Sequence, residues 1–126
     1  MQTVSSMVPH DTAFVDPTRI EHLVRQIGTG AAERFVGRTL EDLAVLLNRL
    51  ERAQTAGDGS GIVAHASAQT TIADELGLVT VGRVADDVVR AIARGDEAAL
   101  GAIIARLMRV GEQSLVAVWS AHDMSL

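Results

Sequence analysis

The stretch Asp58–Leu78, DGSGIVAHASAQTTIADELGL, decides how the rest of the chain is interpreted. Its apolar and small residues recur at the spacing of about 3.6 that is typical of a helix with one buried face. Asp58 is a residue type that caps helix N-termini, and Gly77 is the type that ends helices. We therefore predict a helix over about 59–76, and this helix carries His65, the histidine most interesting for chemistry.

Similar start and stop signals divide the rest of the chain into further helices. Asp16-Pro17 is typical of a helix start, with Asp as the cap and Pro in the first turn. The pair Gly-Asp occurs at 57–58 and again at 95–96, where it would end one helix and cap the next. Apolar residues at helical spacing then predict helices over about 16–27, 31–56 and 79–94, and from Asp96 to about 119.

Long amphipathic helices joined by short loops must pack as antiparallel neighbours. We therefore predict an all-α fold, an up-and-down four-helix bundle with a short extra N-terminal helix packed on one end. The 126 residues suit one domain. The expected organisation is a flexible N-terminal arm over 1–15, the bundle over 16–119 and a C-terminal tail over 120–126.

Composition excludes several classes of partner. The net charge of −5 and the aromatic content of 2% argue against binding to nucleic acid, which needs basic and stacking side chains. No apolar run approaches membrane-spanning length, and the N-terminus lacks the basic start of a signal peptide. We expect a soluble cytoplasmic protein with no membrane partner.

Composition also restricts the chemistry. The chain has no Cys and no Lys, which excludes thiol catalysis, P-loop phosphate binding and Schiff-base formation. His10, His22 and His122 are scattered and lack metal-ligand spacing. The sequence predicts no metal site and no cofactor.

Three short motifs stand in an order that resembles a known family: Ala56-Gly57-Asp58, then Leu76-Gly77, then Arg94-Gly95-Asp96. Over roughly residues 16–119, this order resembles the histidine-phosphotransfer (HPt) domains of two-component phosphorelays. The resemblance implies a four-helix bundle that docks the receiver domain of a response regulator or a sensor kinase. It also implies a phospho-accepting histidine on the helix that follows the first Gly-Asp pair.

In that family the acceptor lies about nine residues after the Asp and ten before the Gly, and both flanks place it at Ser67. The family's lysine then corresponds to Thr70 and its following glycine to Thr71. His65 lies two residues too early. At about 100° per residue, one face of this helix gathers Ile62, Ala66, Gln69, Ala73 and Leu76. His65 falls roughly 40° from the centre of this face and Ser67 roughly 160° from it. We therefore expect Ser67 to face solvent and His65 to lean toward the core.

Three functions remain open. The first is an HPt-like signalling protein that docks its partner with an altered phosphotransfer centre, since a serine ester is a poor phosphoryl donor. The second is a competent phosphotransfer protein that uses His65, a phosphotransfer intermediate at most. The third is an unrelated helical protein that self-associates as a homodimer. The expected partner-docking face consists of small, uncharged residues on the outward side of the 59–76 helix: Val63, Ala64, Ser67, Ala68, Thr70 and Thr71.

Overall fold

The chain folds into α-helices that follow one another with short connections. The computed structural model describes the backbone of residues 13–124 and the side chains of residues 13–121. The elements are α2 (Pro17–Ile27), α3 (Thr29–Ala56), α4 (Gly59–Leu76), α5 (Val79–Arg94) and α6 (Glu97–Met124). The predicted all-α fold is confirmed. None of the described helices is both long and apolar enough to cross a membrane.

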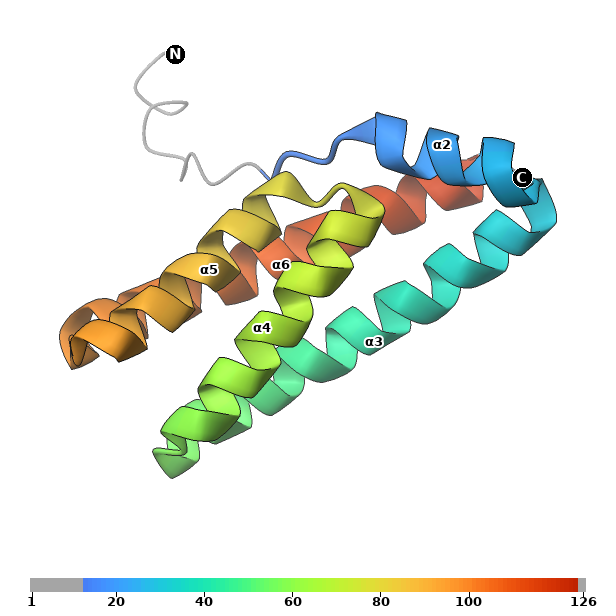
Figure 1. The fold of residues 1–126 in the computed structure, drawn as a ribbon. Coiled ribbons are helices and arrows are strands. Elements are labelled where there is room, and N and C mark those ends of the chain that lie inside the picture. The colour runs from blue at the N-terminus through green and yellow to red at the C-terminus, as the bar shows by residue number, and fades with distance from the viewer. Residues whose placement is uncertain (1–12, 125–126) are drawn as a thin grey trace, which may run out of the picture.

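Helices α3 to α6 form the predicted bundle. Each helix packs on its neighbours in sequence, and α6 closes the ring by packing on α3 (Figure 1). Helices α4 and α6 therefore occupy opposite corners. The short connections reverse the chain direction at every step, which gives the up-and-down arrangement.

The extra N-terminal helix lies where the two long helices of the bundle extend beyond the two short ones (Figure 1). Helices α3 and α6 have 28 residues each, whereas α4 has 18 and α5 has 16. The long helices extend beyond the α4–α5 pair, and α2 runs from the α4–α5 turn to the start of α3 (Figure 1). Helix α2 packs on α3 and α4, with Ile20 and Leu23 partly buried against the core.

The Gly-Asp junctions work as the sequence predicted. Gly57 has a φ of 68°, a left-handed conformation that suits glycine, and its N–H donates to the last carbonyls of α3. The Asp58 carboxylate then accepts from the Gly61 N–H at 3.0 Å and caps α4. Asp96 repeats this cap by accepting from the Ala99 N–H at 3.0 Å.

Two helix boundaries differ from the prediction. Helix α3 begins at Thr29 rather than near Ala31, because Gly28 both ends α2 and starts α3. The Gly28 N–H donates to Val24 O at 2.8 Å, and Gly28 O accepts from the Ala32 N–H at 3.0 Å. Helix α6 continues to Met124, so the bundle extends past the boundary expected at 119 into the segment expected to be a tail. Residues 125–126 lie outside the described part.

The N-terminal segment is fastened across the α4–α5 turn. Val15 forms an antiparallel bridge with Leu78, and the Asp16 N–H donates to Gly77 O at 2.7 Å. Gly77 has a φ of 75°, and a Cβ there would lie 2.5 Å from Asp16 O, so only glycine fits this crossing. Residues 13–15 thus belong to the fold, although the flexible arm was expected to extend to 15. Residues 1–12, with His10, lie outside the described part, as does the side chain of His122.

The core is aliphatic, since the chain has only two Phe, one Trp and no Tyr. Its fully buried side chains come from all four bundle helices, and Leu43 of α3 is 0% exposed. The largest of them are Leu43, Leu50, Leu76, Leu78, Ile104 and Leu107.

Replacing Leu43 with Ala should lower the free energy of unfolding by about 2–5 kcal/mol, because the change removes buried methyl groups and leaves a cavity. Chemical denaturation followed by circular dichroism measures the change. Val45→Ala is the control, since Val45 lies on the same helix and is 47% exposed. A loss below about 0.5 kcal/mol in Leu43→Ala would mean that this stripe is not core.

Candidate functional site

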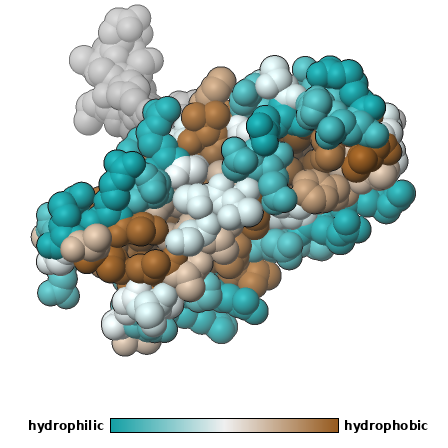
Figure 2. Space-filling view, viewed as in Figure 1, coloured by the Kyte–Doolittle hydropathy of each residue, from teal (hydrophilic) through white to brown (hydrophobic). Residues whose placement is uncertain are grey.

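The outward face of α4 carries the residues expected to dock a partner. Ala64, Ser67 and Thr71 are exposed, and Val63, Ala68 and Thr70 are half-buried at its edges. The first three follow one another at intervals of three and four residues, so they lie on one side of the helix. In Figure 2 the surface over the middle of α4 is pale, which marks weakly polar residues.

The two threonines of this face use their hydroxyl hydrogens within the helix. The Thr70 hydroxyl donates to Ser67 O at 2.6 Å, and the Thr71 hydroxyl donates to the same carbonyl at 3.5 Å. The Thr70 hydroxyl hydrogen is then not available to a partner or to water, whereas the longer Thr71 contact holds its hydrogen only weakly. The face is therefore less polar than its composition suggests, and no residue assigned to it carries a charge.

Ser67 and His65 differ in exposure, in the sense expected from helix geometry. Ser67 is exposed, and His65 is half-buried. Neither the Ser67 hydroxyl nor the His65 imidazole forms a hydrogen bond within the described part of the chain. Residues two apart on a helix do not face each other, so the structure does not bring these two side chains together as a nucleophile and its base.

The N-cap residue of α4, Asp58, carries a carboxyl group with a lowered pKa. The Gly61 N–H, and then the Ser60 hydroxyl, lower the pKa of the Asp58 carboxyl below its ordinary value, because both hydrogen bonds favour the charged form. A smaller desolvation effect raises that pKa, and the His65 side chain lowers it by less still. Asp58 and His65 therefore lie within electrostatic range of each other on the same helix.

Helix α4 also carries a polar side chain into the core. Gln69 is 0% exposed, and neither its amide nitrogen nor its amide oxygen has a hydrogen-bond partner among the described residues. Ser114 of α6 is equally buried, and its hydroxyl likewise has no partner in this part of the chain. Sequence periodicity placed Gln69 on the core face, but it missed Ser114. The spacing of Ser114 from Leu107, Val110 and Val118 could have revealed it.

Replacing Gln69 with Met should raise the free energy of unfolding by about 1–3 kcal/mol, because an unpaired amide is costly to bury and Met is similarly unbranched. Thermal and urea denaturation measure the change. Gln26→Met on exposed α2 is the control and should stay within about 0.5 kcal/mol. A clear loss of stability in Gln69→Met would instead show that the amide is hydrogen-bonded in solution.

A groove of about 630 Å³ adjoins the outward face of α4, at the end of the bundle where α2 begins. Thr70 belongs to both the face and the groove. The charged residues along the groove come from three helices and their caps, and sequence reasoning did not bring them together: Asp16, Arg19, Asp74, Arg83 and Asp86.

Comparisons with known proteins identify no relative: no protein family, curated protein or solved structure matches this chain.

Proposed function

We propose that this protein is an HPt-like signalling protein that docks the receiver domain of a response regulator, or a sensor kinase, through the outward face of α4. The observation that carries the proposal is the position of this face. It is uncharged, it lies on one helix of a four-helix bundle, and Ser67 is exposed within it. A weakly polar surface of this kind is favourable to cover with a partner, because little polar solvation is lost.

Docking without efficient phosphoryl transfer is the activity that these residues favour. A relay passes the phosphoryl group between an aspartyl acyl-phosphate and an imidazole phosphoramidate, which both have high transfer potential. A serine phosphate ester is much lower in energy, so a transfer to Ser67 would not reverse. Within the described residues, no hydrogen bond joins the Ser67 hydroxyl to a base that could remove its proton. The proposed role is therefore that of an adaptor or decoy.

The charge on an incoming phosphoryl group also lacks its usual partner. The chain contains no Lys, and the position that corresponds to the family's lysine holds Thr70. The Thr70 hydroxyl is turned to the backbone of its own helix. Arginine is the cation left in this chain to stabilise a phosphoryl group.

Replacing Ala64 with Arg should weaken receiver binding about 100-fold, because a charged side chain would be desolvated without a partner in the middle of the interface. Binding is measured by calorimetry against a panel of purified receiver domains. Ala68→Arg should act in the same direction. Ala105→Arg is the control, since Ala105 is exposed on α6, at the opposite corner of the bundle.

Two results would contradict this docking face. Equal binding by the wild type and Ala64→Arg would place the partner elsewhere. A stable homodimer that Ala64→Arg dissociates, with no binding to any receiver, would instead favour self-association through the same face. Circular dichroism of each variant separates these results from unfolding.

Wild-type protein incubated with a receiver acyl-phosphate and Mg²⁺ should take up little or no acid-labile phosphate. Ser67→His should raise the uptake, because an exposed imidazole nitrogen can attack the phosphorus, displace the receiver carboxylate and lose its proton to solvent. Thr70→Lys in addition should raise it further by stabilising the phosphoryl charge. Radiolabelled phosphate retained on the protein is the measurement.

His65→Gln is the matched control for this chemistry. It should leave the low uptake of the wild type unchanged. Strong labelling of the wild type that disappears in His65→Gln would make His65 the acceptor and would show a competent phosphotransfer protein.

A further inference from the structure

The groove beside α4 has a floor built from residues with little or no side chain. Ala73 of α4 and Gly82 of α5 line it together with Gly77 from the turn between these helices. A Cβ on Gly82 would lie 3.2 Å from the Ala73 Cβ, so the two helices are almost in backbone contact. Charged side chains stand around this floor, and the groove is open to solvent. It can therefore receive a side chain from another molecule.

The acidic side chains of the groove all have partners within the chain. The Asp16 carboxylate caps α2 by accepting from the Thr18 N–H at 3.0 Å and from the Thr18 hydroxyl at 2.8 Å. Both hydrogen bonds lower the pKa of the Asp16 carboxyl. Asp74 pairs with Arg19 at 3.6 Å. Asp86 accepts a hydrogen bond from Arg90.

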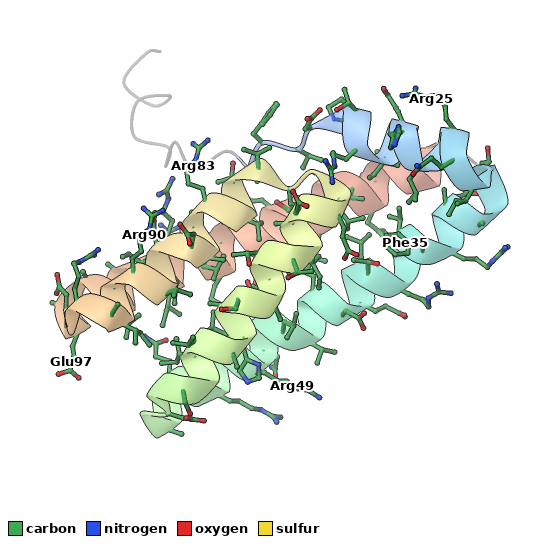
Figure 3. The ribbon with its side chains drawn as sticks, in the orientation of Figure 1. Arg25, Phe35, Arg49, Arg83, Arg90 and Glu97 are labelled. Carbon is green, nitrogen blue, oxygen red and sulfur yellow. The ribbon has the colours of Figure 1, made fainter. Side chains whose placement is uncertain are left out.

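Arg83 is the exception among these charges. It is exposed, and it forms no hydrogen bond or ion pair within the described residues. Figure 3 shows Arg83 projecting from α5 near the N-terminal end of that helix. Three carboxylates and two guanidiniums line the groove, and among these charged side chains Arg83 is the one without an intramolecular partner in the described residues.

We propose that Arg83 receives an acidic side chain of the protein that docks on α4, and thereby sets the orientation of that partner. This inference rests on the proposed docking function, because Thr70 joins the groove to the docking face. The guanidinium is a planar fork of donors that matches a carboxylate in two parallel hydrogen bonds. The uncharged face supplies contact area, and Arg83 supplies a directional contact at its edge.

A charge at the rim of an interface acts mainly on orientation and association rate. On a chain with negative net charge, an acidic partner is repelled over most of the surface. An unpaired cation at the edge of the docking face favours the orientation that places a carboxylate of the partner against it. Arg83 is therefore a specificity-determining residue that selects receivers with a carboxylate at the matching position.

The test measures binding of a receiver domain to Arg83→Glu and Arg83→Gln variants of the full chain. Charge reversal should weaken binding about tenfold at low salt, mostly through slower association, and Arg83→Gln should weaken it less. The difference from wild type should shrink in 0.5 M NaCl. Added salt shortens the Debye length from about 10 Å at 0.1 M toward about 3 Å at 1 M, so the charge at position 83 acts over a shorter range. Replacing the matching receiver carboxylate with Arg should restore binding to Arg83→Glu.

Arg25→Glu is the matched control. It changes the net charge equally from an exposed position at the far end of α2 (Figure 3). Unchanged binding in Arg83→Glu, together with lost binding in Ala64→Arg, would overturn the role of Arg83 and leave the docking function intact. Equal weakening by Arg25→Glu and Arg83→Glu would overturn it as well, since net charge would then explain the effect. Absence of receiver binding by the wild type would overturn both.

Discussion

The close packing of α4 on α5 is the constraint on which the rest of this structure depends. Ala73 and Gly82 meet with almost no side chain between the two helices, so the Ala73 side of α4 is turned toward α5. With α4 in this rotation, Gln69 is buried, Ser67 is exposed and His65 is half-buried. The same contact forms the floor of the groove beside the docking face. The candidate acceptor and the buried amide therefore lie on the same helix, and the groove lies beside it.

The proposed function follows from what this rotation exposes. An exposed serine on an uncharged helix face can be covered by a partner, but it has no hydrogen-bonded base in the described residues and the chain has no lysine. The imidazole that could accept a phosphoryl group is half-buried, near the capped start of the helix. These properties together favour a protein that binds signalling partners without passing on a phosphoryl group efficiently.

Polar side chains without a hydrogen-bond or ion-pair partner occur both in the core and on the surface of the bundle. Gln69 and Ser114 are buried without hydrogen-bond partners among residues 13–121, and burying an unpaired polar group lowers the free energy of unfolding. Arg83 is unpaired within the described residues but exposed, so it carries little cost and remains available for binding. An unpaired polar group lowers the free energy of unfolding when it is buried, whereas an exposed one is solvated by water and can bind another molecule.

The sequence by itself determined the helices, their approximate ends and the apolar face of each, because capping residues and helical periodicity are local properties. It predicted that Ser67 would be exposed and that Gln69 would lie on the core side, since both follow from position on one helix. Only the tertiary structure decided that α3 starts at Thr29, that residues 13–15 cross the α4–α5 turn and that α6 runs to Met124. Only the tertiary structure also decided which charges are paired around the groove, because pairing depends on distances between helices. Periodicity shows which face of a helix is buried, but the neighbour that covers that face is set by packing in three dimensions.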